Sequence, residues 1–155
     1  MLTIEIPGRD SLLLEHLLLD YNGTIATDGR LLEGVAERLA RLAETVQIHI
    51  LTADTFGTVT AQCQGLPAAI KTFPAAGAAL WKAQIAHNLS GGIAAVGNGY
   101  NDAQMYDAAD LAIQVMGEEG CCVQALAHAD ILVRNVQDAL DLLLKPGRLK
   151  ATLRS

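Results

Sequence analysis

Residues 17–24 read LLLDYNGT, and this stretch decides the expected fold. Three consecutive leucines predict a strand that is buried on both faces, as in a parallel sheet covered by helices. The strand ends at Asp20, and the Asn-Gly that follows is a turn signal. A carboxylate is therefore expected at the carboxyl end of a central strand, where open α/β sheets bind their ligands.

Short apolar strands and amphipathic helices alternate along the rest of the chain. Predicted strands cover residues 2–6, 17–19, 48–51, 69–72, 93–96, 111–115 and 131–133. Predicted helices cover residues 32–42, a segment around 59, and residues 76–89, 103–108, 123–127 and 138 onward. A tight hairpin is expected within residues 22–29, and residues 145–147 read as a linker. The alternation predicts an α/β fold with a doubly wound, mostly parallel sheet and a short extra strand or hairpin at the N-terminus.

Chain length and composition limit the possible domain organisation and function. The chain has 155 residues, about the size of one domain, so we expect residues 1–155 to form a single domain. A formal net charge of −6 argues against a nucleic-acid partner. No apolar run approaches the roughly 20 residues of a membrane helix, and no membrane partner is expected. Three cysteines, two of them adjacent, do not suggest a disulfide framework, and we expect a cytoplasmic protein without a cleaved signal.

Polar residues follow several of the predicted strands. Thr52 ends one apolar strand, and the loop Gly-Asn-Gly-Tyr-Asn-Asp at residues 97–102 follows another. Asp20, Thr52, Asn98 and Asp102 should therefore gather at one edge of the sheet.

Four segments, in this order, resemble the four motifs of the haloacid-dehalogenase superfamily. Residues 17–24 resemble the nucleophile motif, an apolar strand that delivers Asp-x-x-Gly-Thr into a loop. Residues 50–52 are similar to the second motif, Lys82 or else Lys71 to the third, and residues 97–102 to the fourth. Residues 103–117 and 151–154 make the chain look most like the phosphorylation domain of P-type ATPases, as a soluble branch of that group.

The chemistry of Asp20 can also be argued without the resemblance. A carboxylate can attack phosphorus and divide a difficult hydrolysis into formation and breakdown of an aspartyl phosphate. Attack by one anion on another needs a neutralising cation, and Mg²⁺ often takes one or two carboxylates, which Asp20 and Asp102 could supply.

The resemblance implies further roles. It implies three groups of residues: catalytic Asp20, Thr52 and Lys82; Mg²⁺ ligands Asp20, Asn22 through its backbone carbonyl, Asn98 and Asp102; and phosphate or substrate contacts at Asn22, Gly23, Thr24, Ala53 and Asn101. Simpler interpretations stay open for single residues: Asp102 or Thr52 as a helix cap, and Lys82 as a solvated surface lysine.

Two positions depart from the family pattern. Asn22 stands where phosphatases of the superfamily have the aspartic acid that protonates the leaving group, and an amide cannot do this. Asn98 stands where the fourth motif usually has a metal-binding aspartate, so metal affinity should fall. P-type ATPases also lack the acid, and the resemblance implies slow hydrolysis of a phosphorylated Asp20.

The stretch between Asp20 and Thr52 holds only the predicted hairpin and one helix. Neither a cap nor a nucleotide-binding domain fits there, so ion pumping is excluded and the site should be open on one side. A macromolecular substrate or a neighbouring subunit would have to close it, which makes a homo-oligomer possible.

Three functions follow, in order of preference. The first is a slow Mg²⁺-dependent phosphatase or phosphotransferase that acts on a small phosphorylated substrate or a phosphoprotein, best on one that needs no acid. The second is a catalytically degenerate phosphate-binding regulatory module. Hydrolytic dehalogenation comes last, because in the family that the chain resembles it relies on a cap.

Overall fold

The structure is a computed structural model that describes all residues, 1–155. Its centre is a seven-stranded sheet with the order β6-β5-β2-β7-β8-β9, and β1 pairs with β2 outside this path. All neighbours are parallel except β1 and β2. The strands are β1 (Leu2–Ile4), β2 (Leu12–Asp20), β5 (Gln47–Thr52), β6 (Ala69–Thr72), β7 (Gly92–Gly97), β8 (Leu111–Val115) and β9 (Ile131–Val133). The predicted α/β fold, with a mostly parallel sheet and an extra N-terminal strand, is confirmed.

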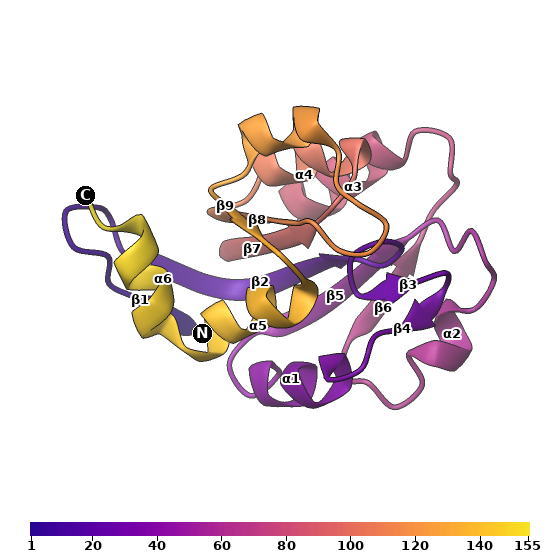
Figure 1. Cartoon of the computed structure of the whole chain (residues 1–155), viewed down its shortest axis with the longest axis horizontal. Coiled ribbons are helices and arrows are strands. Elements are labelled where there is room, and N and C mark those ends of the chain that lie inside the picture. Colours follow the sequence, from indigo (N-terminus) through magenta and orange to yellow (C-terminus); the bar gives the residue numbers. More distant parts are fainter.

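Helices cover both faces of this sheet (Figure 1). They are α1 (Val35–Leu42), α2 (Val59–Gln62), α3 (Ala78–His87), α4 (Ala103–Asp107), α5 (Val136–Leu144) and α6 (Pro146–Leu153), with 3₁₀ turns η1 (Tyr100–Asp102) and η2 (Val123–His128). Leu17 and Leu19 pack on the face covered by α1 and α5, and Leu18 packs on the face covered by α3 and α4. The three leucines of β2 are fully buried, as expected for a strand between two helical layers.

The predicted hairpin after Asp20 is present. Strands β3 (Ala26–Thr27) and β4 (Arg30–Leu31) pair antiparallel around a two-residue turn. Asp28 and Gly29 in this turn have φ angles of 51° and 76°, and a tight hairpin turn needs positive φ at both central positions. The hairpin lies at the end of the sheet where β2 delivers Asp20 (Figure 1).

Three details differ from the sequence-based expectation. β2 begins at Leu12 rather than at Leu17, because its first residues extend past β5 to pair with β1. Residues 123–128 form a 3₁₀ turn rather than an α-helix. Residues 145–147 are not a linker: Pro146 begins α6, where its missing N–H and fixed φ suit the first helical position.

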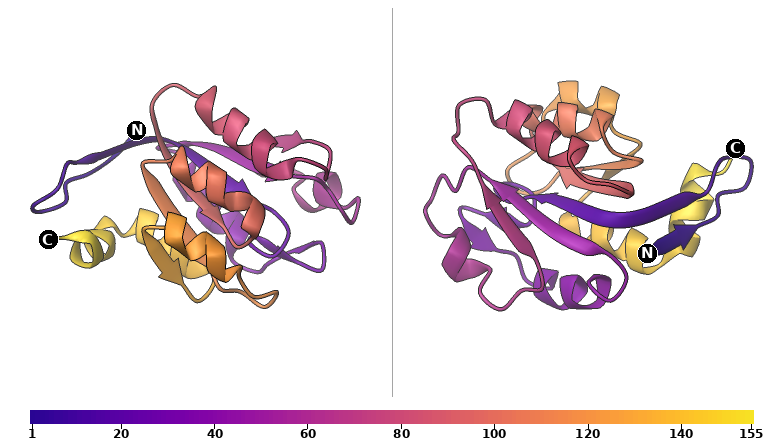
Figure 2. Two further views of the ribbon diagram at one scale, coloured as in Figure 1. Left: turned by 90° about the horizontal axis from the view of Figure 1, so that it is seen from above. Right: turned by 180° about the vertical axis from the view of Figure 1, so that it is seen from behind.

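Strand β1 and helix α6 form the end of the molecule opposite β3 and β4 (Figures 1 and 2). Leu149 of α6 and Ile4 of β1 are fully buried in the same apolar cluster. The backbone N–H of Ser155 also donates to the Pro7 carbonyl, which ties the C-terminus to the β1–β2 turn. No helix has the length and apolar character needed to cross a membrane.

Replacement of the N-cap residue of α5 tests how this helix begins. The Asn135 side chain accepts a 2.8 Å hydrogen bond from the Asp138 backbone N–H. Asn135→Ala should lower the free energy of unfolding by about 0.5–2 kcal/mol, whereas Asn135→Asp should keep most of the stability, because both asparagine and aspartate cap helices. Urea denaturation measures both changes. Equal stability of the alanine variant and the wild type would contradict the capping role.

Candidate active site

A cavity of about 230 Å³ opens at the carboxyl ends of β2, β5 and β7. Most of the residues predicted for the site line it: Asp20, Asn22, Thr52, Ala53, Lys82, Asn98 and Asn101. Gly23, Thr24 and Asp102 lie beside it without lining it. Gly99, which belongs to the predicted 97–102 loop, also lines the cavity, and so do Thr55, Phe73 and Ala78, which were not predicted as site residues.

Lys82 is buried, with 1% of its surface exposed, and its ammonium group is the centre of the site. Its Nζ donates to Asp20 Oδ1 at 2.6 Å, to Asp102 Oδ1 at 2.7 Å and to Asn101 Oδ1 at 2.9 Å. Burial alone would lower the pKa of Lys82, but the two carboxylates outweigh it and raise that pKa above its ordinary value. Lys82, and not Lys71, is therefore the lysine that contacts Asp20.

Asp20 is the carboxylate that faces the cavity. Oδ2 of Asp20 accepts a 3.0 Å hydrogen bond from the Thr24 hydroxyl, while Oδ1 faces Lys82. Burial and the negative charge of Asp102 raise the pKa of Asp20 to about 6, although Lys82 and Thr24 act in the opposite direction. In this arrangement Asp20 becomes a fully ionised nucleophile only above that pH.

Asp102 has no exposed surface, and protein donors use both of its oxygens. Oδ1 accepts from Lys82, and Oδ2 accepts from the backbone N–H groups of Asn98 and Gly99 at 3.0 and 2.9 Å. A Cβ at Gly97 would lie only 2.4 Å from the Asp102 carboxyl group, so only glycine fits there. These contacts support a role in holding Lys82 and the 97–102 loop. A side-chain cap on α4 is not formed, and the metal role of Asp102 stays a prediction.

Asn98 makes contacts on several sides. Its Oδ1 lies 3.3 Å from Thr24 Oγ1, whose one proton is shared with the nearer Asp20 Oδ2, and its Nδ2 donates to the Gly120 carbonyl at 3.1 Å. Gly23 packs against it so closely that an added Cβ would lie 2.4 Å from Asn98 Nδ2. The same glycine has a φ of 81°, so both space and backbone conformation favour glycine here.

Thr52 ends β5 with its hydroxyl at the cavity. Its Oγ1 accepts from the Asp54 backbone N–H at 2.8 Å, which leaves the hydroxyl proton available to a ligand. The N-cap residue of α2 is Thr58, and the Oδ1 of Asp54 accepts from the N–H groups of Thr58 and Val59. The alternative interpretation of Thr52 as a helix cap is thus wrong, since its hydroxyl accepts from Asp54 and not from a residue of α2.

The oxygen atoms around the cavity fit a hard cation. Asn22 Oδ1 is buried and has no hydrogen-bond partner, and such an atom needs a donor or a cation. Asp20 and the Asn98 Oδ1 lie on the same cavity, and Mg²⁺ prefers oxygen ligands while keeping several waters. No group of three or more His, Cys, Asp or Glu residues comes together to hold a metal, so any cation here relies on few charged ligands.

No protein-family model matches the chain. Two uncharacterized proteins of Methanocaldococcus jannaschii are similar in sequence. One is 50% identical over 62 residues, which cover 40% of this chain and 67% of that protein. The other is 64% identical over 39 residues, which cover 25% of this chain and 89% of that protein. The chain belongs to one family with these proteins.

Solved structures identify the fold. A Streptomyces avermitilis protein described as a HAD family hydrolase aligns with a TM-score of 0.65 and 18% identity, over 84% of this chain and 82% of that one. The chain therefore has the fold of a haloacid-dehalogenase (HAD) family hydrolase. The 3-deoxy-D-manno-octulosonate 8-phosphate phosphatase of Moraxella catarrhalis, in complex with magnesium, phosphate and KDO, aligns with a TM-score of 0.65 and 18% identity, over 91% of this chain and 94% of that one.

The likeness to P-type ATPases also has a structural counterpart. A zinc-transporting PIB-type ATPase in its E2.Pi state aligns with a TM-score of 0.59 and 25% identity. The alignment covers 78% of this chain but only 20% of the ATPase. The chain therefore matches one part of a much larger transporter.

The titration of Asp20 tests the electrostatics of the site. Its carboxyl carbon, followed by NMR in EDTA, should titrate near pH 6 rather than near the ordinary value of 3.8. Because the folded state favours the protonated acid, this group should reduce stability as the pH rises from about 4 to about 6. Asp141 is the internal control, since its hydrogen bond from Arg38 lowers its pKa. A midpoint near 4 for Asp20 would contradict this account.

Removal of the Lys82 charge tests the ion cluster, which consists of Lys82, Asp20 and Asp102. Lys82→Met leaves two buried carboxylates without their cation, and breaking such a pair costs about 3–5 kcal/mol of unfolding free energy at pH 7. The loss should shrink at pH 5, where Asp20 takes up a proton. Lys71→Met is the matched control on β6 and should change stability by less than about 0.5 kcal/mol. Similar losses in both variants would count against the cluster.

Proposed function

We propose that this chain is a Mg²⁺-dependent phosphatase-type hydrolase that forms an aspartyl phosphate on Asp20. The observation that carries the proposal is the buried Lys82 ammonium, 2.6 Å from the Asp20 carboxylate at a cavity lined mostly by polar residues. A phosphate group that entered this cavity would meet the Thr52 hydroxyl as a donor. The magnesium- and phosphate-bound phosphatase of the same fold supports this direction.

In the first step an Asp20 carboxylate oxygen attacks phosphorus. The new P–O bond forms as the bond to the leaving group breaks, and the leaving group departs with the electron pair. Thr24 and Lys82 hold the carboxylate in place through their hydrogen bonds. The charge of Lys82 also offsets part of the negative charge that gathers in the transition state.

Asn22 determines which leaving groups this step tolerates. A side-chain amide can hydrogen-bond the departing oxygen but cannot give it a proton. The favoured substrates are therefore phosphates whose leaving group is stable as an anion, such as acyl and aryl phosphates. They include both small molecules and phosphoproteins.

Asp20, the Asn22 backbone carbonyl and Asn98 would hold a Mg²⁺ ion, with Asp102 as a further candidate. When bound, the cation would neutralise charge on the phosphate and on Asp20. In the second step water attacks phosphorus as the P–O bond to Asp20 breaks, Asp20 departs as a carboxylate, and the proton of the water goes to the released phosphate. Asn22 offers no base for that water, so breakdown of the phosphoenzyme should be slow.

A phosphate-binding regulatory module is the second candidate. The amides at positions 22 and 98 favour it, because each stands where the superfamily usually has a carboxylate. Such a module would bind inorganic phosphate with Mg²⁺ and would be stabilised by it without turnover. A rise in melting temperature with phosphate, combined with no hydrolysis of any phosphate ester, would favour the module over the enzyme.

The dependence of rate on the leaving group tests the enzyme. Wild-type turnover of aryl phosphates should rise steeply as the pKa of the leaving group falls, and acetyl phosphate should be hydrolysed faster than alkyl esters. Asn22→Asp should raise turnover of alkyl phosphates by about 10²–10⁴-fold and flatten that dependence, because it restores a general acid.

Three controls frame this experiment. Asp20→Asn and removal of Mg²⁺ should each abolish turnover, and Asn88→Asp, an exposed site outside the cavity, should change nothing. If a folded Asn22→Asp variant gains no activity on alkyl phosphates, the acid argument is wrong. If wild type and Asn22→Asp are both inactive with Mg²⁺ on every substrate, the enzyme proposal itself fails.

A further inference from the structure

Gln114 is an unusual residue for its position. It lies in β8, whose five residues LAIQV are all buried, and none of its own surface is exposed. A buried amide must find hydrogen-bond partners, because an unpaired polar group in the interior is costly. The partners of Gln114 therefore say what the residue does.

The amide of Gln114 links three segments. Its Nε2 donates to the Asn98 carbonyl at 3.0 Å and to the Cys122 carbonyl at 3.3 Å, and its Oε1 accepts from the Tyr106 hydroxyl at 2.6 Å. Carbonyl oxygens only accept, so the nitrogen must face them, and this fixes the orientation of the amide. Burial also raises the pKa of Tyr106 well above its ordinary value, which keeps the hydroxyl protonated as a donor.

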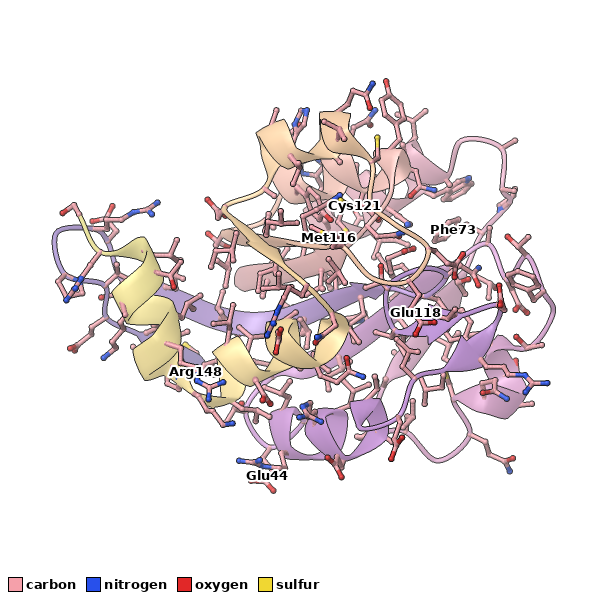
Figure 3. The ribbon with its side chains drawn as sticks, in the orientation of Figure 1. Glu44, Phe73, Met116, Glu118, Cys121 and Arg148 are labelled. Carbon is pink, nitrogen blue, oxygen red and sulfur yellow. The ribbon has the colours of Figure 1, made fainter.

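Two further hydrogen bonds join Asn98 to the loop that contains Cys122. The backbone N–H of Cys122 donates to the Asn98 carbonyl at 2.8 Å, and Asn98 Nδ2 donates to the Gly120 carbonyl at 3.1 Å. Residues 116–122, which we call the 116–122 loop, are thus fastened to Asn98. Figure 3 labels Met116, Glu118 and Cys121 along this loop, which reaches toward the side of the molecule where Phe73 lies.

We propose that Gln114 is a positioning residue for the active site: it fastens the 116–122 loop to Asn98 and thereby sets the Asn98 side chain against Thr24 at the cavity. The role of the positioned Asn98 side chain in cation or phosphate binding rests on the proposed function, but the attachment of the loop to Asn98 does not. Gln114 contacts no reacting atom and acts through Asn98.

This arrangement gives the amide at position 98 a use. An aspartate there would lose the donor to the Gly120 carbonyl, and a carboxylate oxygen would face that carbonyl oxygen instead. Asn98 therefore helps to attach the loop. It also leaves the candidate cation site with one negative charge fewer than an aspartate would give.

Amide hydrogen exchange on the full chain, without metal or substrate, tests the proposal. Gln114→Leu should speed exchange of the Cys122 N–H by about tenfold or more, since one lost hydrogen bond has a net value of that order. Amides of β5, such as Ile50, should keep their relative protection. Gln84→Leu, the same substitution on the exposed side of α3, is the matched control and should change neither.

Two further variants keep the test decisive if Gln114→Leu does not fold. Tyr106→Phe removes only the hydroxyl that donates to Gln114 Oε1 and should speed exchange at Cys122 by about two- to tenfold. Asn98→Asp should speed it as well, and its effect should not add to that of Gln114→Leu, because both act on one network.

The proposal is overturned if folded Tyr106→Phe and Asn98→Asp, or folded Gln114→Leu, leave the Cys122 exchange rate at its wild-type value. It is also overturned if exchange at Ile50 rises by the same factor, since Gln114 would then support only the global fold. Neither outcome depends on turnover, so an inactive wild-type protein with the expected exchange pattern would reject the phosphatase proposal alone.

Discussion

The Lys82 ammonium between Asp20 and Asp102 is the interaction on which the rest of the site depends. Two buried carboxylates this close would repel each other and take up protons without it. Helix α3 brings the lysine in, and the other buried residues of that helix are all alanines. A helix held by small side chains gains little from apolar burial, so the ion cluster contributes to how α3 docks as well as to the chemistry.

Sequence reasoning located the strand-end residues for a simple physical reason. The carboxyl ends of parallel strands meet at one edge, so Asp20, Thr52 and Asn98 come together once the strands are correctly assigned. Lys82 could not be placed in this way. Its neighbours Leu80 and Trp81 are exposed while the lysine is buried, which inverts the hydrophobic pattern of an ordinary surface helix. Only the family resemblance pointed to it, and that resemblance left Lys71 open.

The residues that sequence reasoning missed are those whose role depends on contacts far along the chain. Gln114 carried a signal, since a glutamine inside an otherwise apolar strand must be hydrogen-bonded if it is buried, but nothing in the sequence named Tyr106 or Asn98 as partners. The start of α6 was missed for another reason. Lys-Pro-Gly is a common turn signal, and Pro146 is also a favourable first residue of a helix, so local preference could not decide.

The amides at positions 22 and 98 affect the charge balance of the ion cluster formed by Lys82, Asp20 and Asp102. Carboxylates at both positions would place four negative groups around one lysine, and such a site would depend on a bound cation for its stability. With Asn22 and Asn98, two carboxylates face one ammonium, and burial leaves Asp20 with a pKa of about 6. At most one negative charge then remains in excess, and it is neutralised when Asp20 takes up a proton. The two amides, which lower the expected metal affinity and remove the general acid, therefore also reduce the electrostatic cost of bringing these residues together, and this links the stability of the site to the proposed phosphate chemistry.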